Sequence, residues 1–255
     1  MPPTQTLHSS LRAPSLALLI AEPFRAMFDA LGSHATAQPS AIGDGHPVIV
    51  YPGLGAGSMN TSQLRIFLKR AGFEVSDWGG GVNLGHEGEF DDWLGGLARN
   101  VRVLQAQHAG RKVSLIGWSL GGIFAREIAK LAPDSVRTVI TLATPFASPG
   151  GIYHPGAIYK LRKGGSQFER EREARLRESP PVPTTSLYSK TDGIVCWRSC
   201  IEKRTHRAES VEVDASHLGM VNHPDVLRIV ANRLAQPEGG WKPLRRAERI
   251  GRTRH

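Results

Sequence analysis

Short apolar runs alternate with stretches of helical periodicity through most of this chain. Each run has the length of a strand that is buried on both faces of a parallel sheet. The stretch that follows a run repeats apolar residues every three or four positions, as one face of a helix does. This order of strand and helix predicts an α/β domain with a mostly parallel sheet. The apolar runs lie around residues 46–52, 113–118, 136–142, 184–188 and 211–213.

The first 45 residues follow a different pattern. Apolar residues recur at helical spacing over residues 16–31, and no strand-like run precedes residue 46. We therefore expect a helical extension, residues 1–45, packed on a domain that spans residues 46–236. No apolar run approaches the ~20 residues that cross a bilayer. The one stretch that resembles a secretion signal is short and ends at Glu22, so the sequence favours a cytoplasmic protein.

The composition is that of an ordinary soluble globular protein, with 40% hydrophobic and 22% charged residues. A chain of 255 residues can bury roughly 70 to 75% of its unfolded surface in one core, so we expect one domain. The net charge is +9, and in residues 237–255 six Lys and Arg oppose two Glu. We expect this segment to be a basic, disordered tail. Its alternative role is weak contact with an anionic membrane, and we expect no nucleic-acid partner.

A serine flanked by glycines follows the second apolar run. Residues 117–121 read Gly-Trp-Ser-Leu-Gly, and helical periodicity begins directly after them. This is the layout of a nucleophile elbow, in which a strained turn between strand and helix projects the Ser119 hydroxyl clear of the backbone. Such a turn leaves no room for side chains at positions 117 and 121, which accounts for the two glycines. The alternative is a glycine-rich turn in an ordinary strand–helix unit, because so short a motif also occurs by chance.

Two further polar residues follow later apolar runs and are suited to activate this serine. Asp192 lies in an acid–glycine turn after one run, and His217 lies after the next. A serine hydroxyl needs a histidine to take its proton, and that imidazole needs a carboxylate to hold its tautomer. Loops at the carboxyl ends of parallel strands converge on one crevice, where Ser119, Asp192 and His217 can meet. Asp214 is a competing carboxylate, but its direction depends on strand register, whereas the glycine turn can aim Asp192 at a neighbouring loop.

The sequence resembles the α/β-hydrolases, and among them the bacterial esterase and lipase-like members. The resemblance extends over about residues 45–235 and implies an α/β-hydrolase fold with helices on both faces of the sheet. Because residues 1–45 lack the two leading strands of a full-length member, we expect a reduced sheet of about six strands. The motifs that carry the resemblance are Gly-Trp-Ser-Leu-Gly-Gly at residues 117–122, Ser-Lys-Thr-Asp-Gly-Ile-Val at 189–195 and Ser-His-Leu-Gly-Met at 216–220.

The resemblance also implies how the site works. In this family a loop before the elbow supplies one amide of the oxyanion hole, and this amide corresponds here to Leu54, although the glycines beside it also fit a simple turn. The second amide is that of Leu120, at the start of the helix after the serine. The implied function is hydrolysis of small-molecule or lipid esters through an acyl-enzyme on Ser119, without a cofactor. The alternatives are acyl transfer, thioester or amide hydrolysis on the same triad, or a fold that only binds ligands.

Two more features bear on the site. Residues 149–183 lie where hydrolases insert a lid or cap, with a surface crossover as the alternative. Cys196 and Cys200 are close enough in a helical turn for a disulfide, but free thiols are expected in a reducing compartment. No spacing of His, Cys, Asp and Glu fits a metal template, so no metal site is predicted. The sequence does not predict the oligomeric state.

Overall fold

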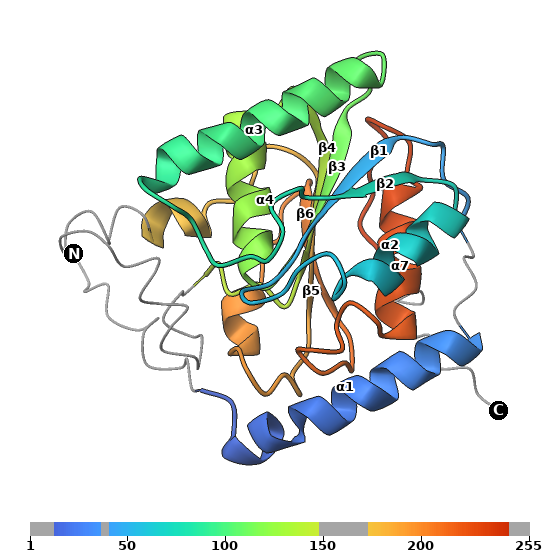
Figure 1. Ribbon diagram of the computed structural model, residues 1–255, viewed down its shortest axis with the longest axis vertical. Coiled ribbons are helices and arrows are strands. Elements are labelled where there is room, and N and C mark those ends of the chain that lie inside the picture. Colours follow the sequence, from blue (N-terminus) through green and yellow to red (C-terminus); the bar gives the residue numbers. More distant parts are fainter. Residues whose placement is uncertain (1–12, 37–40, 148–172, 245–255) are drawn as a thin grey trace.

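The core of the fold is a six-stranded sheet in which all strands run parallel, in the order β2-β1-β3-β4-β5-β6 (Figure 1). The computed structural model describes residues 13–36, 41–147 and 173–244 of the chain. The parallel sheet of about six strands that the sequence predicts is confirmed. The strands are β1 (Pro47–Tyr51), β2 (Glu74–Asp77), β3 (Val113–Trp118), β4 (Val136–Leu142), β5 (Thr184–Tyr188) and β6 (Ala208–Glu212).

Helices cover both faces of the sheet, as predicted. α3 and α4 pack on one face, whereas α2 and α7 pack on the other (Figure 1). A single turn of 3-10 helix, η2, follows β5. The bounds are α1 (Leu16–Thr36), α2 (Ser62–Arg70), α3 (Phe90–Gln107), α4 (Leu120–Leu131), α7 (Pro224–Leu234) and η2 (Trp197–Cys200).

Strand β1 is apolar along its whole length because each of its faces meets a helical layer. In β1, Val48 and Val50 join the core beneath α2 and α7, whereas Ile49 and Tyr51 join the core beneath α3 and α4. Successive side chains of a strand point to opposite faces, so a continuous apolar run feeds both cores. The edge strand β2 lacks such a run, since Val75 is its buried residue, and the apolar pattern therefore misses it.

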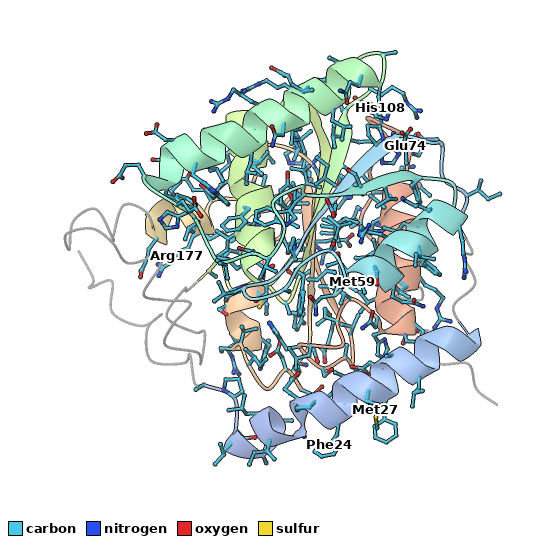
Figure 2. All side chains as sticks on the ribbon, viewed as in Figure 1. Phe24, Met27, Met59, Glu74, His108 and Arg177 are labelled. Carbon is cyan, nitrogen blue, oxygen red and sulfur yellow. The ribbon has the colours of Figure 1, made fainter. Side chains whose placement is uncertain are left out.

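The N-terminal helix α1 lies across the end of the sheet at which the strands finish (Figure 1). Its carboxylate Glu22 accepts backbone N–H groups from the loops after β5 and β6, which fixes this placement. Its apolar residues face outward instead, and Figure 2 shows Phe24 and Met27 pointing away from the rest of the molecule. No helix of the described segments is long and apolar enough to cross a membrane.

The C-terminal segment departs from the expectation of a disordered tail that begins at residue 237. Leu244 is only 5% exposed and belongs to the core beneath α7, and its N–H donates to Glu209 Oε2 at 2.7 Å. The carbonyl oxygen of Lys242 accepts a hydrogen bond from Arg233 at 2.7 Å. The chain therefore packs on the domain as far as Leu244, and residues 245–255 lie outside the described residues.

The expected lid or cap falls largely outside the described residues as well, because residues 148–172 are not among them. The remainder of that insert packs beside α4. Leu176 and Val182 are buried in the core on this face, and the buried Arg126 of α4 donates to the carbonyl oxygen of Glu178 at 2.9 Å. Residues 173–183 are therefore packed on the domain beside α4.

Candidate active site

The serine of the predicted elbow lies in a strained turn between β3 and α4. Ser119 has φ 54° and ψ −120°, a conformation that residues with a side chain rarely adopt. A Cβ on Gly117 would lie 2.3 Å from the Cα atom of Gly122. A Cβ on Gly121 would lie 2.4 Å from the carbonyl oxygen of Tyr51. Because these approaches admit only hydrogen, the glycines are what lets the elbow form.

Three side chains that are far apart in the sequence form one hydrogen-bonded chain. His217 Nε2 lies 3.1 Å from Ser119 Oγ, and His217 Nδ1 lies 2.7 Å from Asp192 Oδ2. The carboxylate and the imidazole are buried, whereas the serine is partly exposed. With Nδ1 donating to the carboxylate, Nε2 can accept the serine proton. The structure thus brings together the three residues that the sequence analysis put forward.

The carboxylate of Asp192 is held by its own turn. Its Oδ1 accepts two backbone N–H groups of the following residues, each at 2.8 Å, which leaves Oδ2 directed at His217. The competing Asp214 lies elsewhere. Its side chain is 87% exposed and contacts the side chains of Arg25 and Thr191. Of the two carboxylates, Asp192 is the one bonded to the imidazole.

The charges around the imidazole favour its protonated form. Burial of His217 opposes that form, but the charge of Asp192, its hydrogen bond and the charge of Glu22 outweigh burial and raise the pKa of His217 above its ordinary value. A raised pKa makes the imidazole a stronger base. It also stabilises the imidazolium that forms when the serine gives up its proton.

The loop after β1 lies against the serine. A Cβ on Gly53 would lie 3.3 Å from the Cβ atom of Ser119, a distance tighter than ordinary contact, so a glycine allows this approach. Leu54 is the next residue of this loop, and Leu120 is the first residue of α4. Both amides put forward for the oxyanion hole therefore belong to segments that adjoin the serine.

A buried asparagine fixes that loop, and it was not put forward from the sequence. The side-chain amide of Asn83 donates to the carbonyl oxygen of Pro52 at 2.7 Å. Its backbone N–H donates to Ala56 at 2.8 Å, and its carbonyl oxygen accepts from Gly55 at 2.7 Å. The one signal in the sequence is a lone asparagine within a glycine-rich stretch. Because that composition is ordinary for loops, it gave no reason to assign a role.

The helix α1 supplies a second set of positioning contacts. Glu22 is buried, and its Oε1 accepts the N–H of Gly193 at 2.6 Å and that of His217 at 3.0 Å. Its Oε2 accepts the N–H of Leu218 at 3.1 Å. One carboxylate therefore ties the turn that carries Asp192 to the turn that carries His217.

Two more polar residues of α1 bond to the same loops. Asp29 Oδ2 accepts from Ser216 through its backbone N–H at 2.9 Å and through its hydroxyl at 2.6 Å. Arg25 donates to the hydroxyl of Thr191 at 2.7 Å. The sequence offers only a weak signal for these roles, since a few charged residues in an apolar helix usually mark its solvent face. Here they mark the face that is turned toward the protein.

A second aspartate–histidine–serine chain lies at the opposite end of the sheet. His46 Nδ1 lies 2.5 Å from Asp44 Oδ1, and His46 Nε2 lies 2.7 Å from Ser114 Oγ. The histidine and the serine are fully buried, and burial lowers the pKa of His46. Since this serine lies within β3 and has no exposed surface, the chain serves to satisfy buried polar groups.

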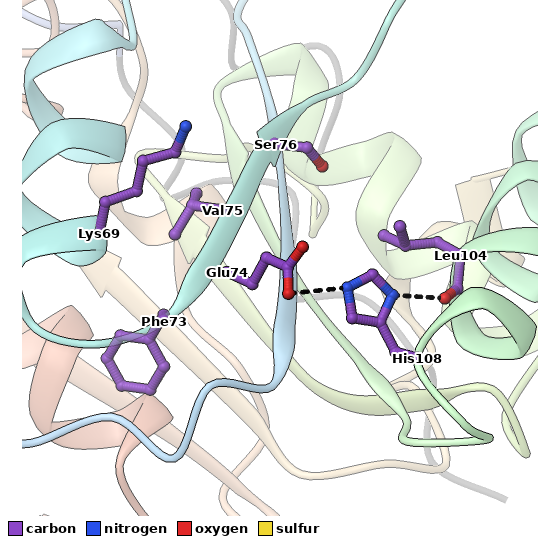
Figure 3. A pocket seen from close by; sticks show the side chains of 7 residues that line it. All are labelled: Lys69, Phe73, Glu74, Val75, Ser76, Leu104 and His108. Carbon is purple, nitrogen blue, oxygen red and sulfur yellow. Dashed lines mark hydrogen bonds and ion pairs between the residues drawn. The ribbon is translucent and has the colours of Figure 1, made fainter.

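A surface depression of about 270 Å³ lies beside the edge strand β2 (Figure 3). His108 Nε2 lies 3.0 Å from Glu74 Oε2 on its wall, and the carbonyl oxygen of Leu104 accepts from His108 at 2.8 Å. Glu74 pairs with the first residue of β1, so the depression adjoins the ends at which the strands begin. None of its lining residues belongs to the group around Ser119, and we assign it no part in the chemistry.

Within the described residues, neither the cysteines nor a metal site adds a reactive group to the site around Ser119. Cys196 and Cys200 are free and buried, and burial raises the pKa of the Cys200 thiol well above its ordinary value. Within the described segments, no group of three or more His, Cys, Asp and Glu side chains is placed to hold a metal ion.

Comparison with known sequences relates part of the chain to two groups of proteins. A family model described as the PGAP1-like alpha/beta domain matches residues 97–196, a range that includes the elbow and Asp192. A poly(3-hydroxyalkanoate) polymerase subunit of Allochromatium vinosum is 34% identical over 79 residues. That match covers 30% of this chain and 22% of the polymerase subunit, so it spans about a fifth of the length of that relative.

Solved structures resemble most of the chain. A monoacylglycerol lipase of Paleococcus ferrophilus superposes with a TM-score of 0.53 and 18% identity, over 78% of this chain and 98% of the lipase. A Bacillus licheniformis lipase gives a TM-score of 0.56 and 16% identity, over 79% and 94%. A serine hydrolase without a lid from Xanthomonas campestris gives 0.52 and 16%, over 77% and 83%. With its six-stranded parallel sheet, the chain has the α/β-hydrolase fold that these enzymes share.

Proposed function

We propose that this protein is a serine hydrolase that cleaves carboxylic esters. The observation that carries the proposal is the hydrogen-bonded chain from Asp192 through His217 to Ser119. Its serine occupies a strained turn at the amino end of a helix, where backbone amides and the helix dipole favour negative charge. Lipases and esterases among the similar structures support the same substrate class.

The first half of the reaction forms an acyl-enzyme. Ser119 Oγ attacks the carbonyl carbon of the ester while His217 Nε2 takes the hydroxyl proton. The amides of Leu54 and Leu120 bind the oxyanion of the tetrahedral intermediate. The intermediate collapses, the alcohol oxygen leaves with the proton from His217, and the acyl group stays on the serine as an ester.

The second half returns the enzyme to its first state. Water gives a proton to His217 Nε2 and attacks the acyl carbon, which forms a second oxyanion in the same place. Collapse breaks the bond to Ser119 Oγ, which recovers the proton from the imidazole, and a carboxylic acid leaves. Asp192 keeps its charge throughout and holds the imidazole in the tautomer that both halves require.

A second candidate is transfer of the acyl group to an alcohol or a thiol instead of water. The local similarity to a poly(3-hydroxyalkanoate) polymerase subunit supports this second candidate. The triad is the same for either acceptor, because the two reactions differ only in what attacks the acyl-enzyme. Product analysis with and without added alcohol separates them.

Hydrolysis of p-nitrophenyl esters with short and long acyl chains tests the proposal. We expect turnover in the wild type and about a 10⁴-fold loss in Ser119→Ala at an unchanged melting temperature. A folded wild-type protein that cleaves no ester, thioester or amide in a broad panel would leave the ligand-binding alternative in place.

A further inference from the structure

The outer surface of α1 is apolar, and this orientation is the reverse of that of an ordinary surface helix. A surface helix normally turns its apolar stripe to the core and its charges to water. In α1 the charged residues Glu22, Arg25 and Asp29 are bonded to the domain. Six large apolar residues of the helix are 53% to 66% exposed: Leu16, Ile20, Phe24, Met27, Phe28 and Leu31.

A patch of this kind needs an occupant. Soluble monomers rarely leave more than a few hundred Å² of contiguous apolar surface uncovered. Between residues 16 and 32 every exposed side chain is apolar, and Ala17 and Pro23 extend the stripe formed by the larger residues. An isolated exposed leucine would be unremarkable, but a continuous face along a helix of 21 residues is not.

The chemistry of the patch fits hydrocarbon better than another protein. Interfaces between proteins carry about one hydrogen bond per 100 to 200 Å² and a polar rim. The exposed side chains between residues 16 and 32 provide no hydrogen-bond donor or acceptor. A helix that lies in a lipid surface needs none on its buried face, and helices of 20 to 30 residues are common there.

The position of the patch connects it to the site. Glu22 accepts hydrogen bonds from the backbone N–H groups of His217 and Leu218, so the inner face of the helix touches the loop that carries His217. Leu218, in the same loop, is 38% exposed. A lipid surface that covered the outer face would therefore lie about one helix diameter, ~10 Å, from the loop that carries His217. The net charge of +9 adds attraction to anionic headgroups.

We infer that α1 docks this enzyme on a lipid surface through its outer apolar face, which brings the triad to esters held in that surface. The inference deepens the proposed function, since it states where the ester is encountered. The inner and outer faces of α1 then have linked roles. The inner face holds the loops of Asp192 and His217, and the outer face enters the boundary between headgroups and acyl chains.

The test compares two double variants of the full chain. The first variant, Phe24→Gln with Phe28→Gln, removes two aromatic rings from the patch. Glutamine is a good helix former, so the helix should be retained. Val103→Gln with Leu131→Gln is the matched control, because these residues are 54% and 47% exposed on α3 and α4. Figure 1 shows α3 at the end of the sheet opposite α1. Binding to phosphatidylcholine vesicles is measured by flotation at low and at high salt, and the sedimentation coefficient is measured without vesicles.

We expect wild type and control to bind vesicles at both salt concentrations, since apolar burial is not screened by salt. The Phe24/Phe28 variant should partition at least ~10-fold more weakly, because two buried rings are lost. It should hydrolyse an ester embedded in vesicles more slowly, yet retain its melting temperature and its rate on soluble p-nitrophenyl acetate within about twofold.

Three results from vesicle binding and sedimentation would overturn the inference. They are absence of vesicle binding by the wild type, equal loss in the control variant, and a wild-type dimer that dissociates in the Phe24/Phe28 variant. A loss of soluble-ester hydrolysis in that variant would equally refute it, by showing that the rings act on the triad. If the wild type cleaves no ester, the proposed function fails, and the vesicle-binding result still decides the docking surface.

Discussion

The carboxylate of Glu22 accepts the backbone N–H of His217 at 3.0 Å, although 195 positions separate the two residues. The same carboxylate accepts the N–H of Gly193, next to Asp192. The N-terminal helix therefore joins the two loops whose side chains must meet for the relay to work. Glu22 acts on the imidazole in two ways, through the backbone and through its negative charge.

We expect Glu22→Gln to change the pH profile of ester hydrolysis. His217 must be neutral to accept a proton, so kcat/KM falls as the pH drops through the pKa of His217. The charge of Glu22 raises this pKa, and its removal therefore moves the acid-side fall to lower pH. The plateau rate should fall as well, because Leu218 loses its acceptor. The pH dependence of kcat/KM from pH 5 to 9 checks both effects.

Glu22→Asp serves as the comparison for this variant, because it keeps the charge and shortens the reach. Its acid-side fall should stay closer to that of the wild type than that of Glu22→Gln. Loss of hydrogen bonds to a buried carboxylate costs about 2 kcal/mol, so both variants should melt at a lower temperature. A Glu22→Gln profile that overlays the wild type would show that the helix plays only a structural role.

The sequence predicts the elbow and the parallel sheet because local rules fix them. Gly117 and Gly121 are sterically required beside the strained Ser119, and an apolar run is typical of a strand that is covered on both faces. Both signals lie within a few residues of the feature they report. This is why five of the six strands, the elbow and the order of Ser119, Asp192 and His217 could be read from the sequence, whereas the edge strand β2 could not.

The role of α1 could not be read in this way. Glu22, Arg25 and Asp29 find their partners more than 160 positions away, and helical spacing alone does not tell which face meets the protein. The packing of the C-terminal segment could not be predicted from the sequence either. Its charge suggested a solvated end, but one apolar residue, Leu244, has a place in the core and holds the preceding residues on the domain.

Of the two serines that bond to a histidine in the described part of the chain, only Ser119 should react. A fluorophosphonate should label Ser119 and leave Ser114 unmodified in the native protein. Ser114 Oγ also contacts an imidazole, at 2.7 Å, but it is fully buried and lies within β3 instead of in a turn. Mass spectrometry of the labelled peptides checks this, with Ser119→Ala as the control. Label on Ser114 in folded protein would show that the reagent reaches this buried serine, which would contradict the prediction.

Two truncations should differ in stability although both remove basic tail residues. A chain that ends at Leu244 keeps the buried side chain and its bond to Glu209, whereas a chain that ends at Pro237 loses them. We expect the shorter chain to be less stable by about 2 kcal/mol, since a buried leucine contributes about that much. Urea unfolding of both chains, with Leu244→Ala in the longer one, measures the difference. Equal midpoints would show that residues 238–244 contribute little to the domain.

The choice between the two carboxylates that the sequence offers, Asp192 and Asp214, can be settled by two matched substitutions. Asp192→Asn keeps the shape of the side chain but removes the acceptor that fixes the tautomer of His217, so turnover should fall by as much as about 10⁴-fold at neutral pH. Asp214→Asn should cost far less, because that carboxylate is exposed and bonds to Arg25 and Thr191 instead. Turnover and melting temperature are measured side by side. A folded Asp192→Asn enzyme with near-normal turnover, beside an inactive but folded Asp214→Asn, would reverse the assignment of the carboxylate that orients His217.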